Sequence, residues 1–225
     1  VESSASAAGV GHRSSQAAGT MARDHELAKT RRMGASIEMA PQSQGEIVAW
    51  AKQVFDQHRP AAIIAIERLG PNEHGLLHYS TGVVPKNYVD LAPLFEEARK
   101  RDVLSIGIGD NGNEIGFGRI HGFMKDFHPY GRRCQYEGGV GVPTVVATDI
   151  FLPASISNWG AYGIAAMLGF LTQKVDLVQT PELERRIVQA CLDAGGWEMR
   201  YCTSRFIVDG TEGESSMAMV QLLRD

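Results

Sequence analysis

The sequence has few cysteines, no excess of basic residues and no long uninterrupted apolar segment. Its three cysteines form no Cys-x-x-Cys pair, which argues against a disulfide framework or a zinc knuckle. We therefore expect a reducing compartment, the cytoplasm or the mitochondrial matrix. Lys and Arg number 22 against 26 Asp and Glu, a formal net charge of −4. This balance argues against bulk nucleic acid or an anionic membrane surface as a partner.

The longest uncharged segment lies between Asp149 and Lys174. Proline and polar residues interrupt its first half, and only residues 161–171 are dominantly apolar, which is too short for a membrane span. We expect a buried helix over residues 157–172 instead, with Ser157 or Asn158 as its N-cap.

The N-terminal residues differ in composition from the rest of the chain. Residues 1–20 are mostly Ala, Ser and Gly and contain no Leu, Ile or Phe, so we expect residues 1–36 to be flexible or irregular. The whole chain has 225 residues, of which 44% are hydrophobic, enough for one sizeable core. Residues 37–225 are therefore predicted to form a single domain.

Helical and strand patterns alternate from residue 43 onwards. The apolar run at residues 61–66 is too short for a helix and does not alternate, which is typical of a central strand covered on both faces. The alternation predicts an α/β fold with a mostly parallel sheet and helices on both faces, in three layers. The expected helices cover residues 43–59, 90–101, 157–172 and 180–194, and the expected strands cover residues 61–66, 103–108, 142–147 and 205–208.

Polar residues follow each of the predicted strands. Ligands of open α/β sheets bind at the carboxyl ends of the strands, so these residues are expected to meet at one edge of the sheet. They are Glu67 and Arg68, residues 110–114, Asp149 and Asp209.

The strongest motif is the glycine-rich segment Gly107–Gly118. It contains the pattern Gly-x-Gly-x-x-Gly, but its acidic residues and late glycines do not suit a pyrophosphate at a helix N-terminus, so a nicotinamide site is disfavoured. Carboxylate and amide oxygens are ligands that Mg²⁺ and Mn²⁺ prefer, and Asp110, Asn113 and Glu114 provide them. The alternative is that Asp110 and Asn113 only form Asx turns with their own backbone.

Two further segments are candidates for binding a substrate. Residues 66–72 carry a carboxylate and a guanidinium out of the first strand, followed by Asn72. Ser157, Asn158 and Trp159 open the uncharged helix, whose N-terminus is suited to a carboxylate. The alternatives are a solvent-facing ion pair for the first segment, and ordinary capping and core packing for the second.

These segments together resemble a known family, the C-terminal domain of D-glutamate cyclase and its bacterial and archaeal relatives. The resemblance covers about residues 60–225, and the glycine-rich and Ser-Asn-Trp-Gly segments are its most specific parts. The matching blocks are Ile64–Arg68 with Gly70, Ser105–Gly118, Ser157–Tyr162, and Val208–Gly210 with Glu214.

The resemblance implies a hydro-lyase that interconverts D-glutamate and 5-oxo-D-proline by cyclisation with loss of water. A divalent cation, Mg²⁺ or Mn²⁺, is expected to assist. The residues assigned to catalysis are Glu67, Asp110 and Glu114; those assigned to the metal are Asp110, Asn113, Glu114 and Asp209; those assigned to the substrate are Arg68, Asn72, Ser157, Asn158 and Trp159.

Two other functions stay open at this point. One is metal-dependent hydrolysis of a small molecule, such as a phosphate ester, and the other is a non-catalytic domain that binds a small ligand or a metal. The expected partner is a small carboxylate or an amino-acid substrate, and not nucleic acid or a membrane. We also expect a homo-oligomer.

Overall fold

The computed structural model describes residues 37–135 and 139–225, so the predicted flexible segment 1–36 lies outside the described residues. The chain divides into two compact units. The larger unit holds Ala40–Thr180 and Ala218–Asp225, and the smaller unit holds Pro181–Met217 together with residues 37–39. None of the helices in the described part of the chain has the length and apolarity that a membrane crossing requires.

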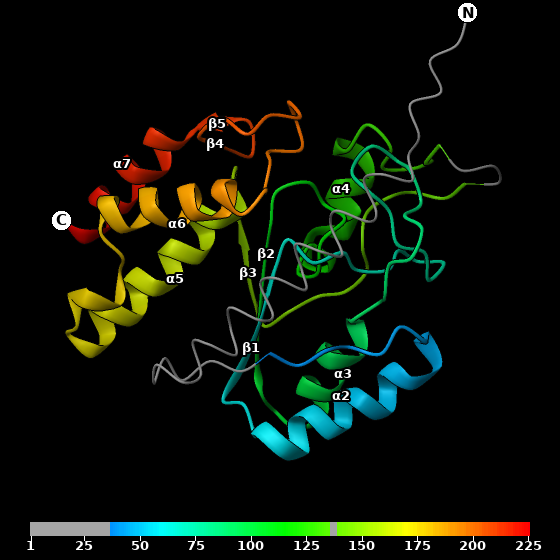
Figure 1. Cartoon of the computed structure of the whole chain (residues 1–225). Coiled ribbons are helices and arrows are strands. Elements are labelled where there is room, and N and C mark those ends of the chain that lie inside the picture. Colours follow the sequence, from blue (N-terminus) through cyan, green and yellow to red (C-terminus); the bar gives the residue numbers. More distant parts are fainter. Residues whose placement is uncertain (1–36, 136–138) are drawn as a thin grey trace, which may run out of the picture. The chain divides into compact units, whose positions relative to one another are not determined.

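A three-stranded parallel sheet forms the centre of the larger unit, as the α/β prediction requires (Figure 1). The strands are β1 (Ala62–Ile66), β2 (Leu104–Gly109) and β3 (Ile150–Pro153), in the order β1-β2-β3. The central strand is therefore β2, whose residues are buried after the first one, and not β1 as predicted. Two isoleucines of β1, Ile64 and Ile66, are 43% and 49% exposed, because β1 lies at an edge of the sheet.

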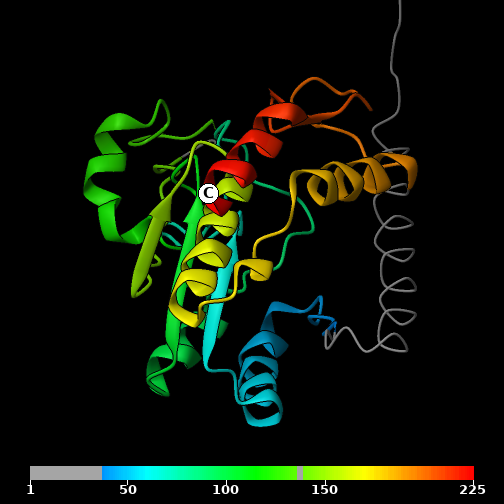
Figure 2. The ribbon, with the colours of Figure 1, turned by 90° about the vertical axis from the view of Figure 1, so that its left-hand side faces the viewer.

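Helices cover both faces of this sheet, as predicted (Figure 2). On one face α3 (Ala92–Lys100) packs against β1 and β2, and α2 (Gln44–His58) packs against α3. Phe95 of α3 enters a core cluster with Ala65 and Ile115. On the other face lies α5 (Ser157–Thr172), which contacts all three strands.

The bounds of α5 agree with the prediction, but its burial does not. Its Tyr162 packs in a cluster with Val178 and Val220, and the latter belongs to α7 (Gly213–Arg224). Side chains near the C-terminal end of α5 are exposed in the described structure, since Phe170 and Leu171 are 71% and 68% exposed. The predicted cap is also wrong, because Ile156 is the N-cap residue and no side chain caps the helix. Uniform apolarity therefore did not mean burial on all sides.

The predicted strand at residues 142–147 is wrong, because this segment is a loop in the structure. Its main chain bonds to two other loops: Thr144 N–H donates to the Gly112 carbonyl, and Val145 N–H donates to the Pro71 carbonyl. The third strand begins only at Ile150. Because β3 runs parallel to β2, Asp149 lies at the amino end of the strand and not at the predicted carboxyl edge.

The last predicted strand is also placed differently. Residues Ile207–Val208 form β4, which pairs antiparallel with β5 (Thr211–Glu212) in a hairpin of the smaller unit. Asp209 and Gly210 form its turn with positive φ angles of 45° and 77°, as tight hairpin turns require. Asp209 is therefore a turn residue and does not follow a fourth strand of the parallel sheet. Its assignment to the metal stays a prediction.

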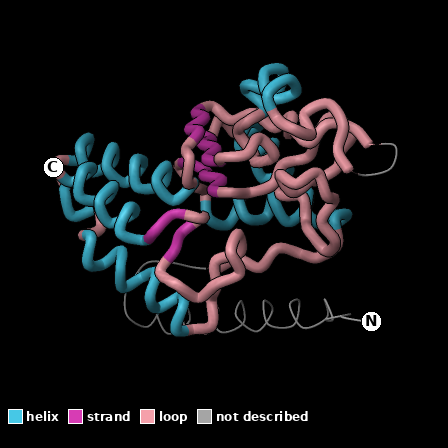
Figure 3. Tube along the Cα trace, turned by 90° about the horizontal axis from the view of Figure 1, so that it is seen from above, coloured by secondary structure: helices cyan, strands magenta, loops and turns pink. Residues whose placement is uncertain are grey.

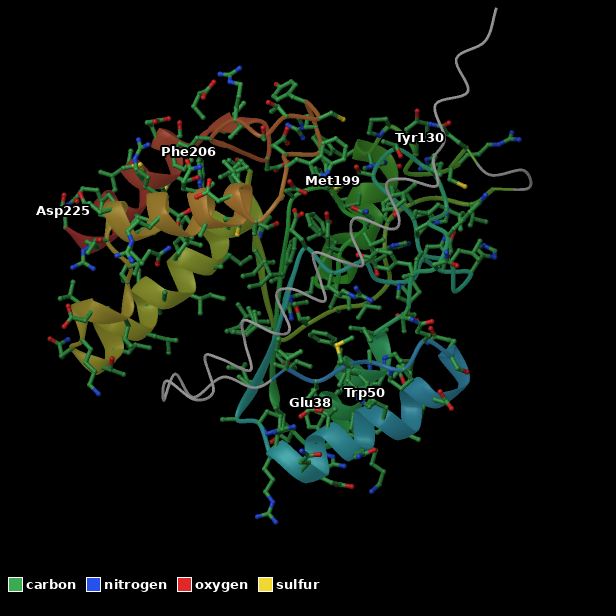
Figure 4. All side chains as sticks on the ribbon, in the orientation of Figure 1. Glu38, Trp50, Tyr130, Met199, Phe206 and Asp225 are labelled. Atoms are coloured by element: carbon green, nitrogen blue, oxygen red, sulfur yellow. The ribbon has the colours of Figure 1, made fainter. Side chains whose placement is uncertain are left out.

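The smaller unit also contains α6 (Pro181–Asp193), close to the helix predicted over residues 180–194. The Arg185 guanidinium lies 4.8 Å from the ring centroid of Phe206, which Figure 4 labels. The remaining elements, all in the larger unit, are the 3₁₀ helices η1 (Gly118–Ile120) and η2 (Val175–Leu177) and the helix α4 (His121–Phe127).

The loop after β2 folds back onto its own strand, and Gly107 permits this close approach. A Cβ atom on Gly107 would lie 2.4 Å from the Ile115 carbonyl oxygen and 2.6 Å from the Gly116 Cα. We predict that Gly107→Ala lowers the free energy of unfolding by about 1–3 kcal/mol, because backbone atoms must move to admit the methyl group. Urea unfolding monitored by circular dichroism measures this.

Gly122→Ala is the matched control, because a Cβ atom there meets nothing within 4 Å and the residue lies in α4. We expect it to be neutral or stabilising by up to about 1 kcal/mol. Equal effects of the two substitutions would contradict the close packing of this loop on β2.

Candidate active site

Two loops leave the sheet at the carboxyl ends of β1 and β2 and join each other there (Figure 3, seen along the strands). Glu67 directly follows β1, and its N–H donates to the Ile108 carbonyl of β2 at 3.0 Å. Beyond the strands, Ile115 N–H donates to the Arg68 carbonyl at 2.8 Å, and Leu69 forms an antiparallel bridge with Glu114. The predicted meeting of these two loops is thus observed.

Their meeting point brings three carboxylates together. Glu67, Asp110 and Glu114 each offer one carboxylate oxygen, and these oxygens all lie within 4.8 Å of one another. Glu67 is exposed, Asp110 is half-buried and Glu114 is 3% exposed. We call these three residues the carboxylate cluster.

Gly109, the last residue of β2, makes room for the most buried of the three. A Cβ atom on Gly109 would lie 2.8 Å from the Glu114 Cβ and 3.0 Å from its carboxyl carbon. The Glu114 side chain therefore lies directly on the bare backbone at the end of β2. The glycine at this position of the pattern thus permits the close approach of Glu114 to the strand.

Glu114 has an environment that favours its protonated form. Burial is the main cause that raises the pKa of its carboxyl group, and the nearby charge of Glu67 also raises it. Hydrogen bonds oppose these effects, since Oε2 of Glu114 accepts from Gly112 N–H at 2.9 Å and from Asn111 N–H at 3.3 Å. The net direction is upward.

Glu67 has a different environment. Its main chain has a positive φ of 52°, an uncommon conformation for a residue with a side chain. Its Oε1 accepts a hydrogen bond from the Ser157 hydroxyl at 2.9 Å. Ser157 is the first residue of α5 and is 2% exposed, whereas the following Asn158 is exposed. The first turn of α5 therefore holds the Glu67 carboxylate in place through the Ser157 hydroxyl.

Arg68 and Asn72 contact the main chain of neighbouring loops. Arg68 Nη2 donates to the Val89 carbonyl, and its guanidinium lies 4.6 Å from the ring centroid of Tyr88. Asn72 Nδ2 donates to the Gly141 carbonyl at 2.8 Å, and Asn72 Oδ1 accepts from two main-chain N–H groups. Both side chains thus hold loops in place in this structure, and their predicted contacts with a substrate stay predictions.

Asn113 and Trp159 are the remaining candidates in the larger unit. Asn113 is 3% exposed, and its Nδ2 donates to the His78 carbonyl at 2.8 Å. Its Oδ1 is buried and has no hydrogen-bond partner within residues 37–135 and 139–225, so an acceptor oxygen remains for a ligand. Trp159 is half-buried and packs against the cluster around Tyr162 and Val178.

Sequence reasoning missed how the site is supported. Tyr88 lies in an irregular segment without a motif, so nothing in the sequence predicted its contact with Arg68. Thr144 is completely buried, and its hydroxyl donates to the Pro71 carbonyl at 2.9 Å. A Cβ atom on Gly70 would lie 2.4 Å from this hydroxyl oxygen. The glycine at position 70 was therefore the feature of the sequence that indicated a close neighbour here.

The carboxylate cluster is chemically suited to two tasks. Three carboxylate oxygens at this spacing form a donor set that suits Mg²⁺ or Mn²⁺. Two carboxyl groups with unlike environments are also suited to taking up a proton at one point and releasing it at another.

Comparison with known proteins gives two matches. The family described as "D-glutamate cyclase-like, C-terminal" matches residues 8–224. The human protein named "D-glutamate cyclase, mitochondrial" is 33% identical over 111 residues, which are 48% of this chain and 17% of the human protein. The match thus spans less than a fifth of the length of the human relative.

The raised pKa of Glu114 has a consequence for stability. The folded chain binds this proton more tightly than the unfolded chain does, so the wild type loses stability as the pH rises above the ordinary value of 4.5 and through the raised pKa. Glu114→Gln removes this loss. We predict that the stability of the variant relative to the wild type increases over that pH range and is constant above it, as measured by urea unfolding at a series of pH values.

Glu73→Gln is the control of opposite sign. A hydrogen bond from Lys125 lowers the pKa of Glu73, so its contribution is present above its ordinary value of 4.5 and is lost as the pH falls through the lowered pKa. This variant should lose stability relative to the wild type at neutral pH only. A pH-independent difference for Glu114→Gln would contradict the proposed environment of Glu114.

Proposed function

The chain belongs to the D-glutamate cyclase-like C-terminal family, and on this premise we propose that it interconverts D-glutamate and 5-oxo-D-proline. The observation that carries this proposal is the carboxylate cluster at the carboxyl ends of β1 and β2, where open α/β sheets bind their ligands. The name of the human relative agrees with the proposal, although the matched region is only a part of that protein.

The proposed reaction makes definite demands on the site. The α-nitrogen attacks the γ-carboxyl carbon, a C–N bond forms and one C–O bond breaks. The ammonium group loses two protons in total, and both end on the departing oxygen, which leaves as water. A site for this reaction must therefore move protons from nitrogen to oxygen, and it must also make an anionic carboxylate open to attack.

Glu67 is the best placed group for moving these protons. It is exposed, and the Ser157 hydroxyl donates to one of its oxygens, so its orientation is held while its other oxygen is available. We assign it to take a proton from the nitrogen and to deliver it to the departing oxygen. A single carboxylate can do both because the nitrogen and the departing oxygen are bonded to the same carbon once the C–N bond has formed.

Asp110, Glu114 and Asn113 are assigned to a divalent cation. Bound Mg²⁺ or Mn²⁺ would polarise the γ-carboxylate, which otherwise resists attack because it is negatively charged. Ligation requires Glu114 to give up its proton, and this carboxyl has a raised pKa. Cation binding is therefore expected to strengthen as the pH rises.

The first turn of α5 is assigned to the other carboxylate of the substrate. Asn158 is exposed there, and the N-terminus of a helix without charged residues attracts an anion through its free N–H groups. Arg68 and Asn72 would then act by holding the loops around the substrate. We propose a reducing compartment, because the three cysteines are an odd number and form no Cys-x-x-Cys pair.

The roles of the carboxylates lead to a test of activity. We predict that Glu67→Gln and Asp110→Asn each lower the turnover of D-glutamate to 5-oxo-D-proline by at least about 100-fold, the size of a lost acid–base group. Chiral chromatography of both compounds in the presence of Mn²⁺ measures this. Glu73→Gln is the control, because Glu73 is an exposed carboxylate outside the carboxylate cluster. Near wild-type turnover in Glu67→Gln would contradict its assigned role.

The proposed cation leads to a second test, which does not need turnover. Mn²⁺ at about 100 times its dissociation constant should stabilise the folded wild type by about 2.7 kcal/mol, because only the folded chain holds the ligands together. Thermal unfolding should show a higher Tm with Mn²⁺, and a larger shift at a pH above the raised pKa of Glu114 than at a pH below it. Asp110→Asn should lose the shift and Glu73→Gln should keep it. An equal shift in Asp110→Asn would place the cation elsewhere.

A further inference from the structure

A cleft lies in the larger unit, between α3 and the loop that precedes β3. Its volume is about 390 Å³, within the usual range of small-molecule sites. Phe95 and Val145 contribute apolar lining, and four charged residues also line it: Glu96, Arg99, Arg119 and Asp149. We call it the α3 cleft.

The α3 cleft is at the other end of the sheet from the carboxylate cluster. Ser105, near the start of β2, lines the cleft, and Asp110 follows the end of the same strand. Asp110 is five positions after Ser105, which corresponds to roughly 16 Å along a strand. A ligand of the α3 cleft would therefore not occupy the proposed active site.

One pair of opposite charges in the cleft is held in place by hydrogen bonds. Asp149 Oδ2 accepts from the Ser105 N–H at 2.8 Å and from the Ser105 hydroxyl at 2.7 Å. Arg119 Nη1 donates to the carbonyl oxygens of Thr148 and Asp149, at 3.0 and 3.1 Å. These hydrogen bonds hold both charged side chains beside the cleft. They use only Oδ2 of the Asp149 carboxylate and Nη1 of the Arg119 guanidinium.

The other pair of charges lies on α3 and is exposed. Arg99 and Glu96 are three residues apart on the helix, and both line the cleft. Within residues 37–135 and 139–225, the Arg99 guanidinium has no hydrogen bond and no ion pair, so its donors are available to a ligand.

We propose that the α3 cleft binds a free amino acid with an apolar side chain. The ligand carboxylate would lie against Arg99 and Arg119, and its ammonium group against Glu96 and Asp149. The cleft carries two charges of each sign, which matches a zwitterion and does not favour a phosphate or a simple carboxylate. The apolar lining accommodates the side chain. This inference does not depend on the proposed cyclase activity.

Isothermal titration calorimetry of the full chain with L-leucine tests the proposal. Two analogues each lack one charge: 4-methylpentanoate has no ammonium group, and 3-methylbutylamine has no carboxylate. We expect saturable binding of leucine, and binding at least about tenfold weaker for each analogue, because each loses a charge-assisted hydrogen bond. Arg99→Gln should weaken leucine binding by a similar factor.

Arg133→Gln is the matched control, since Arg133 is an exposed arginine that does not line the cleft, and it should leave the affinity unchanged. The absence of saturable leucine binding would overturn the proposal, as would equal affinity for 4-methylpentanoate. Binding that survives Arg99→Gln and is lost in Asp110→Asn would place leucine at the carboxylate cluster, which also overturns it. The proposed cyclase activity is untouched by each of these outcomes.

Discussion

The close approach of the segment after β2 to its own strand is the constraint on which the rest of the site depends. Gly107 and Gly109 leave the space into which residues 114–116 fold. This fold-back places Glu114 against the end of β2 and lets it bridge to Leu69 of the neighbouring loop. Further along, the N–H groups of Gly116 and Gly118 bond to the Val146 carbonyl. A side chain at either strand glycine would therefore disturb the active-site loop and the loops that support it.

The same fold-back creates the chemical asymmetry of the carboxylate cluster. Glu114 is buried against bare backbone, and its pKa is raised, whereas Glu67 stays exposed and is held by Ser157. A fold optimised for stability alone has no reason to bury a carboxyl group next to two others. Such an arrangement is common where a site binds a cation or moves protons. The cost in stability and the proposed activity thus have one structural origin.

The sequence was sufficient to predict the α/β class, the bounds of most helices and the meeting of Glu67 with Asp110 and Glu114. These features depend on local patterns and on the rule that parallel strands end at the same edge. Prediction from the sequence was wrong where one local pattern is compatible with two different structures. Residues 142–147 are apolar enough for a strand, but they bond to two loops instead, and this shift moved Asp149 to the opposite end of the sheet. Likewise, an apolar run does not distinguish a central strand from an edge strand such as β1.

The most direct test of the central claim is the hydration of 5-oxo-D-proline in water enriched in ¹⁸O, with the wild-type chain and Mn²⁺. Ring opening by the proposed reaction adds one oxygen from water to the γ-carboxyl carbon. The account predicts that D-glutamate formed in the first turnover carries one ¹⁸O atom in its γ-carboxylate and none in its α-carboxylate, as mass spectrometry of fragments would show. No D-glutamate under any of these conditions, or label in the α-carboxylate, would contradict it.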